Sequence, residues 1–292
     1  MSEFNEDALL EITDMLTTAT ENVEKVYGAG HSKGYQTGYT IGHQDGDESY
    51  YNQGYDAGKQ AEHDAFWDGK QAGGGYKDYT SAFGGRWSAE IFKPKYDIEP
   101  SYANYMFYAN GLNIDLVEHL EKIGRKLDFS KCKGQISCFA ASKFTHLGNV
   151  SATGGFASVF QNCKELVTID EWGHAEGGDI TDTLTNTFAS CEALENITIK
   201  GRIANTIYFH WSTKLTRASI ESIVNALSDN VSGKTLQLSK VAVDEAFMVY
   251  NGPLPEEDPN GYDNPDNWII GSVSGAWMEI CYIHSNWTIT LI

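Results

Sequence analysis

The first regular pattern of hydrophobic positions lies near the N-terminus. Its apolar residues are separated alternately by three and four positions: Leu9, Ile12, Leu16, Ala19, Val23 and Val26. This spacing places them on one narrow seam of a helix, as in a coiled coil of about three heptads. We predict a coiled-coil-like helix over residues 1–30 that self-associates, with a trimer as the expected assembly. A single helix packed on its own domain is the alternative.

A glycine at every fourth position follows the heptads. The glycines are Gly30, Gly34, Gly38, Gly42 and Gly46, and the step resumes at Gly54 and Gly58. Each glycine in a lone helix costs about 1 kcal/mol relative to alanine. We therefore interpret residues 31–75 as helices in close mutual contact, with an extended tether as the other reading. The predicted oligomerisation residues are Leu9, Ile12, Leu16, Val23, Val26, Gly30, Gly34 and Gly38.

The C-terminal two thirds of the chain contains a degenerate repeat, Phe-x-x-Cys-x-x-Leu-x-x-Ile. Phenylalanines at 107, 139, 160, 188 and 209 mark five units, separated by 32, 21, 28 and 21 residues. Such periods are typical of a solenoid, in which neighbouring units stack because none can bury its apolar residues alone. Each Leu-x-x-Ile segment is expected to supply one strand of a parallel ladder. The predicted repeat core is Phe160, Cys163, Leu166, Ile169, Phe188, Cys191, Leu194 and Ile197.

The last part of the chain changes from the repeat to mixed patterns. Apolar residues at 220, 223, 224 and 227 follow helical spacing and predict an amphipathic helix from Ala218. Residues 235–238 are expected to form a strand, and residues 241–247 a second short helix. Residues 286–292 alternate in polarity and predict a final strand. We interpret this block as a cap on the open end of the solenoid.

Net charge narrows the range of partners. The chain of 292 residues carries a formal charge of −19, so nucleic acid and anionic membranes are unfavourable partners. No stretch approaches 18 apolar residues, and we expect neither membrane insertion nor a secretory signal. The five cysteines form no CxxC pair, which favours reduced, buried thiols over a disulfide framework or a zinc site.

The sequence offers little catalytic chemistry. No nucleophile elbow and no pair of histidines four residues apart is present, and we assign no catalytic residue, metal or cofactor. Acidic residues gather at 170–179 and again at 256–266, where calcium binding is an alternative to a solvated loop. Aromatic residues near loops are the preferred ligand-binding candidates: Trp172, Trp268, Trp277 and Tyr262.

The repeat units at 160–169 and 188–197 resemble BspA-like leucine-rich repeats. The segment 215–239, the ending 286–290 and the segments 58–68 and 92–97 are similar to repeat proteins of phages and prophages of gut Firmicutes. The resemblance covers most of the chain and implies a protein associated with a phage tail or fibre. It supplies no catalytic residues.

These observations together predict an α+β chain in five parts. A helical stalk (1–30), a Gly/Tyr-repeat segment (31–75) and a linker (76–100) precede an irregular leucine-rich-repeat solenoid (101–216) and a helix-strand cap (217–292).

The expected function is non-catalytic. We predict a virion tail or fibre component that self-associates, contacts other tail proteins and recognises a host cell-surface protein or glycan. A bacterial surface or secreted adhesin is the first alternative, and a cell-wall polysaccharide-degrading enzyme the second.

Overall fold

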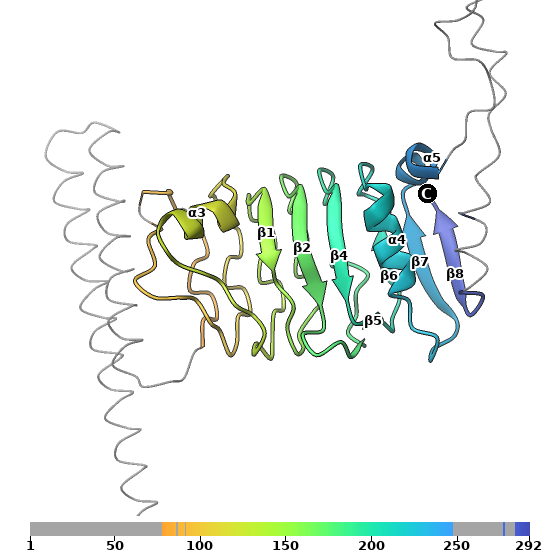
Figure 1. The fold of residues 1–292 in the computed structure, drawn as a ribbon, viewed down its shortest axis with the longest axis horizontal. Coiled ribbons are helices and arrows are strands. Elements are labelled where there is room, and N and C mark those ends of the chain that lie inside the picture. The colour runs from red at the N-terminus through yellow and green to blue at the C-terminus, as the bar shows by residue number, and fades with distance from the viewer. Residues whose placement is uncertain (1–77, 86, 91, 248–276, 278–283) are drawn as a thin grey trace, which may run out of the picture.

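The structure is a computed structural model that describes residues 78–85, 87–90, 92–247, 277 and 284–292. Three short helices and eight short strands follow one another along its long axis in these residues (Figure 1). In chain order they are α3 (Leu116–Lys122), β1 (His146–Asn149), β2 (Thr168–Gly173), β3 (Asp179–Ile180), β4 (Asn196–Lys200), β5 (Arg202–Ile203), β6 (Ile207–Phe209), α4 (Arg217–Asn225), β7 (Lys234–Leu238), α5 (Lys240–Phe247) and β8 (Trp287–Leu291).

The strands form three separate parallel sheets. Strands β1, β2 and β4 make the first, β3 and β5 a two-stranded second, and β6, β7 and β8 the third. In the first sheet Leu147 is paired with Ile169, and Ile169 with Ile197. The predicted parallel strands at the Leu-x-x-Ile segments are therefore confirmed for the units that contain Ile169 and Ile197.

The predicted leucine-rich-repeat solenoid is nevertheless wrong. The described residues form small, separate parallel sheets interrupted by helices, and these sheets do not build a solenoid. Unequal spacing is one reason: extra residues between β2 and β4, and again after β4, form the short pair β3–β5. The register between β2 and β4 also shifts between Ile169 and Trp172, so even the paired units do not superimpose along their length.

Helix α4 provides a second reason, because it ends the first sheet. The side-chain oxygens of Ser219 and Ser222 accept hydrogen bonds from the backbone N–H groups of Ile197 and Ile199 in β4, at 3.0 and 2.8 Å. Those N–H groups would otherwise need a further strand. Thr216 caps the helix by accepting from the Ser219 N–H, which fixes the serines in place.

Helix α3 lies at the opposite end of this sheet, next to β1 (Figure 1). Its N-cap residue, Asp115, accepts a hydrogen bond from the Glu118 N–H and forms a parallel bridge with His146 of β1. Leu116 and Leu120 are its buried residues, so the helix presents its charged face outward. The first sheet therefore has a short helix along each edge.

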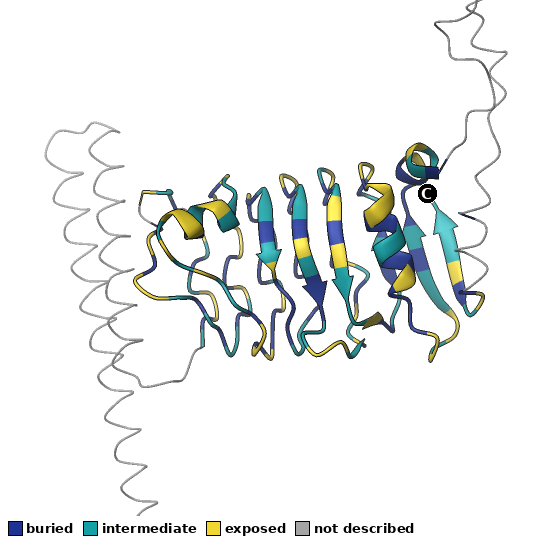
Figure 2. Ribbon diagram, viewed as in Figure 1, coloured by how far each residue is buried: buried dark blue, intermediate teal, exposed yellow. Residues whose placement is uncertain are grey.

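The interior contains a row of phenylalanine rings. Consecutive members lie 5.3, 5.9, 5.3 and 4.3 Å apart between ring centroids, in the order Phe107, Phe139, Phe160, Phe188 and Phe209. We call these five residues the phenylalanine column. All eight predicted repeat-core residues are at most 3% exposed, and buried positions are interspersed with exposed ones along β1, β2 and β4 (Figure 2).

The turns that carry the column contain residues with left-handed backbone. Ala109, Ala141, Asn162 and Ser190 have φ between 53° and 62°. Each is followed by a small buried polar or thiol residue: Asn110, Ser142, Cys163 and Cys191. The thiols of Cys163 and Cys191 donate to the carbonyls of Phe139 and Phe160 in the preceding turn, at 3.0 and 3.1 Å. The small residue thus bonds adjacent turns together.

The segment expected to be a linker belongs to the folded part. Tyr79, Phe83, Phe92 and Ile98 are at most 3% exposed and join the same hydrophobic cluster as the phenylalanine column. Phe83 lies 5.3 Å from Phe107 between ring centroids. The linker prediction for residues 76–100 is therefore corrected where the structure describes them. The aromatic residues of this irregular segment pack into the hydrophobic core.

The local predictions near the C-terminus are confirmed. The amphipathic helix is α4, the second short helix is α5, and the two expected strands are β7 and β8. Strand β7 pairs with β6 and β8.

The predictions for residues 1–75 lie outside the described residues, including the coiled-coil helix and the glycine contacts. None of the helices described is long and apolar enough to cross a membrane.

Candidate functional site

Two of the aromatic residues predicted to bind ligand are buried in the structure. Trp172 is fully buried in β2, where its ring meets those of Phe156 and Phe188 edge-on at 5.8 and 5.1 Å. Trp277 is 6% exposed and packs against Phe247. Both predictions are wrong because proximity to a loop in sequence does not expose a side chain that packs against buried aromatic rings. Trp268 and Tyr262 lie outside the described residues.

An exposed aromatic pair lies elsewhere. Tyr105 and Tyr108 are 44% and 48% exposed, and their rings meet edge-on with centroids 5.9 Å apart. Ile136, on the next turn, is 39% exposed, and its carbonyl accepts from the Tyr105 N–H at 2.9 Å. We call Tyr105, Tyr108 and Ile136 the tyrosine patch.

The backbone under the tyrosine patch is fixed by its neighbours. The carbonyl of Tyr108 accepts from the Gly85 N–H at 3.1 Å, and that of Tyr105 from the Tyr108 N–H at 3.1 Å. Between the two tyrosines in sequence lie Met106 and Phe107, both fully buried. Aromatic side chains held this way offer contact area at little conformational cost on binding.

The sequence held a weak signal for this patch. Phe107 is one of the repeat phenylalanines. Because its side chain points into the interior, some neighbouring side chains in the same turn must point to the surface. Two tyrosines within two residues of a buried repeat position are then candidates for exposure. The left-handed φ of 55° at Tyr105 is not a further signal, because Ser137 and Ser158 have φ of 50° and 54° at related turns.

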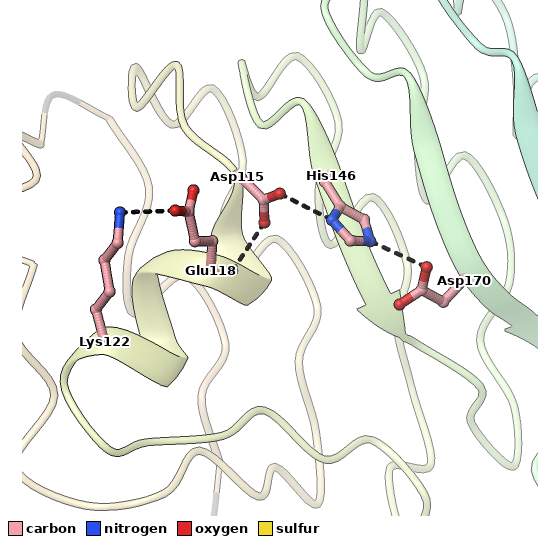
Figure 3. Close-up of polar contacts among 5 residues, drawn as sticks. All are labelled: Asp115, Glu118, Lys122, His146 and Asp170. Carbon is pink, nitrogen blue, oxygen red and sulfur yellow. Dashed lines mark hydrogen bonds and ion pairs between the residues drawn. The ribbon is translucent and has the colours of Figure 1, made fainter.

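A row of charged side chains crosses from α3 to β2 (Figure 3). The Nδ1 atom of His146 lies 2.9 Å from Oδ2 of Asp115, and its Nε2 lies 3.0 Å from Oδ1 of Asp170. Asp115 is fixed because its other oxygen caps α3. We call Asp115, His146 and Asp170 the histidine row. It ties three elements, α3, β1 and β2, through one imidazole.

The histidine row favours a charged imidazole. Partial burial lowers the pKa of His146, but the hydrogen bonds and charges of Asp115 and Asp170 outweigh it and hold that pKa above its ordinary 6.5. Burial raises the pKa of Asp115, but the Glu118 N–H and His146 outweigh it and hold it below the usual 3.8. An imidazolium donates from both nitrogens, so only the protonated ring satisfies both carboxylates.

The arrangement of the histidine row is unsuited to acid–base catalysis or metal binding. Both ring nitrogens already face carboxylates, so neither is directed at a nucleophile. The two carboxylates lie at different nitrogens of the ring, which separates them too far to share one ion. Within the ranges described, no three His, Cys, Asp or Glu residues are grouped to hold a metal.

The described cysteines are buried thiols. Burial raises the pKa of Cys163 to about 12 and that of Cys132 to about 11. Cys138 and Cys191 are also raised well above the usual value by burial. A thiol of this kind does not form the reactive thiolate at neutral pH. These residues therefore act in packing and in bonds between turns.

The two acidic segments of the sequence have different outcomes. In the first, Asp170 belongs to the histidine row, Glu171 pairs with Lys200 at 3.1 Å, and Asp179 pairs with Arg202 at 2.6 Å. These three acids face basic partners on neighbouring strands. The second segment, 256–266, lies outside the described residues.

In comparisons with known proteins, no family model, curated protein or solved structure matches the chain. The resemblance to BspA-like and phage-encoded repeat proteins therefore stays a prediction from the sequence.

Proposed function

We propose that this protein is a non-catalytic recognition component of a phage-type tail or fibre, and that it binds a glycan on the host cell surface. The tyrosine patch is the observation that carries the proposal. It presents two adjacent aromatic rings and one aliphatic side chain on backbone fixed by neighbouring turns. Aromatic side chains of this kind are enriched at binding hot spots, and the apolar face of a sugar ring stacks on them.

The tail setting is supported by the sequence patterns at residues 9–58. A heptad seam followed by regularly spaced glycines is suited to joining several copies of a chain. Several copies would bind the cell surface with higher overall affinity than one copy, since linked binding sites have a high effective concentration for one another. The acidic charge of −19 opposes binding to anionic polymers, so the glycan of this proposal is neutral or cationic.

A binding experiment with two variants tests the recognition step. The full chain is applied to intact host cells and to an array of neutral and anionic cell-wall glycans. Tyr108→Ala should weaken binding to the recognised glycan by tenfold or more, because ring stacking is lost. Val241→Ala removes a side chain that is 53% exposed on α5 and should leave binding unchanged. Equal binding by wild type and Tyr108→Ala would overturn the glycan proposal.

Two further measurements separate this proposal from its alternatives. Binding to protease-treated cells that falls to background would indicate a host protein in place of a glycan. Release of reducing sugar from the bound glycan would indicate an enzyme.

Light scattering on the full chain and on a chain lacking residues 1–60 tests assembly: we expect an oligomer that becomes monomeric on truncation. A full chain that is already monomeric would contradict the assembly step.

A further inference from the structure

A pocket of about 230 Å³ lies between α3 and the first two strands, beside the histidine row. Helix α3, the segment 125–127, the end of β1 and Asp170 of β2 line it. Its volume lies below the ~300–1,000 Å³ typical of sites for drug-sized ligands. An occupant must therefore be small, on the scale of one amino acid or one sugar.

Glycine at position 148 keeps part of the pocket open. A Cβ at this position would stand 3.2 Å from Cγ2 of Val117 and 3.9 Å from Oδ2 of Asp170. Gly148 has no left-handed backbone that would require glycine. Any larger side chain there would occupy space between β1 and α3.

One charged anchor in the pocket is Asp170. Its Oδ1 bonds to His146, while its Oδ2 faces position 148 in the pocket lining. The Asp170 side chain is 55% exposed, so a ligand can approach it. A carboxylate oxygen accepts hydrogen bonds, and its strongest small partner is an ammonium group.

The opposite charge is supplied by Arg125. Its Nε donates to the carbonyl of Pro94 at 3.1 Å, and one terminal nitrogen donates to the carbonyl of Gly124 at 2.9 Å. These bonds fix the guanidinium but do not neutralise it, and no carboxylate of the described residues pairs with it. Lys126, also in the lining, lies 4.0 Å from Asp97. A guanidinium with free donors is a site for a carboxylate.

The remaining lining is mainly aliphatic, with Glu121 and Asn149 as its polar members. Leu116, Leu120 and Val150 are at most 3% exposed and border the pocket. No aromatic ring lines it, so it lacks the stacking surface that a sugar ring favours. A small apolar group fits this lining better, because it buries hydrocarbon without unsatisfied hydroxyl groups.

We propose that this pocket binds a small zwitterion with an apolar side chain, of the size of a free aliphatic amino acid. The ammonium group pairs with Asp170, the carboxylate with Arg125, and the side chain packs against the leucines of α3. This site is separate from the tyrosine patch and does not depend on the proposed glycan recognition.

Titration calorimetry and ligand-observed NMR on the full chain test the proposal with L-leucine as the probe. We expect saturable binding of L-leucine. Isoamylamine and 4-methylpentanoate, which each keep one charge, should bind at least tenfold more weakly, because each leaves one anchor unpaired. Glucose should not bind. Glucose binding equal to leucine, or no leucine binding at millimolar concentration, would overturn the assignment.

Two variants and one control place the ligand in the pocket. Gly148→Val fills the space and should abolish binding, and Asp170→Asn should weaken it at least tenfold. Asp115→Asn breaks the histidine row on the other side of His146 but leaves the pocket lining intact, so it should bind leucine within a few-fold of wild type. Circular dichroism melts confirm folding of each variant. Unchanged leucine binding by folded Gly148→Val contradicts the site.

Discussion

The phenylalanine column and the histidine row are both built across successive turns of the chain, yet different physics holds each one. The column is a line of rings that are fully buried, with thiol and hydroxyl bonds at the corners. The row joins three elements through one partly exposed imidazole and two carboxylates. The first depends on volume and shape, and the second on protonation. Variants at the two places should therefore respond differently to size, pH and salt.

The largest effect is expected in the interior at Leu194. Leu194→Ala should lower the free energy of unfolding by about 2–5 kcal/mol, as large-to-small core substitutions do, because Leu194 is fully buried. Urea denaturation followed by circular dichroism measures the change. Salt and pH should leave the difference from wild type unaltered. A loss under 1 kcal/mol would mean that this unit is not part of the core.

At the corner positions, replacing the cysteine by a polar residue should destabilise the fold less than replacing it by a larger one. Cys191→Val loses the bond to the Phe160 carbonyl and adds a methyl group to a fully buried site, so we expect a loss of about 1–3 kcal/mol. Cys191→Ser should cost less, because Ser212 already makes the same kind of bond to the Cys191 carbonyl at 3.0 Å. The same denaturation assay compares the two. If serine is the more damaging substitution, the hydrogen bond is not what the corner requires.

The histidine row should contribute about 1 kcal/mol or less, and only within a pH window. The raised pKa of His146 means that its contribution is present below about pH 6.5 and is lost as pH rises through the folded-state value. The lowered pKa of Asp115 means that its contribution is present above about pH 3.8 and is lost as pH falls through the folded-state value.

Thermal melts of wild type and His146→Gln should therefore differ most between about pH 4 and 6.5 and converge at higher pH. Lys122→Gln is the matched control. It breaks an exposed ion pair between Lys122 and Glu118, both on α3 (Figure 3). It should change little at any of these pH values. A His146→Gln difference that grows with pH would show that the neutral ring is the preferred form.

The smallest effect on stability is expected at the tyrosine patch. Tyr108→Ala should alter the free energy of unfolding by no more than about 0.5 kcal/mol, since almost half of its side chain is exposed. Denaturation curves that coincide with wild type would allow its binding result to be interpreted directly. A larger loss would place Tyr108 in the fold and weaken its use as a recognition residue.

The column was predictable from sequence, and the row was not. Phenylalanine, cysteine and leucine recur at fixed offsets within units, so their burial follows from the pattern alone. The row depends on a contact between residues 31 positions apart and another 24 positions apart, and none of its three residues occupies a Phe, Cys, Leu or Ile position of the repeat. The burial of Trp172 is hidden in the sequence for a related reason: its ring packs against Phe156 and Phe188, which lie on other turns.

The repeat pattern predicted local strands but not the larger architecture. It indicated parallel pairing at Ile169 and Ile197, which is present. It did not indicate that α4 would satisfy the N–H groups of β4 through Ser219 and Ser222. Those serines were part of a recognisable amphipathic helix, but a helix pattern does not show which strand edge its hydroxyl groups will meet.

The serine hydroxyls of α4 have a consequence for solubility at high local concentration. An uncovered strand edge is a template on which another copy can add its own strand and begin aggregation. Two of the N–H groups that β4 would offer there are already engaged by Ser219 and Ser222. If several copies are held side by side, as the proposed assembly requires, this edge is closed to strand exchange between neighbours. The helix thus removes one route by which neighbouring copies could join their sheets.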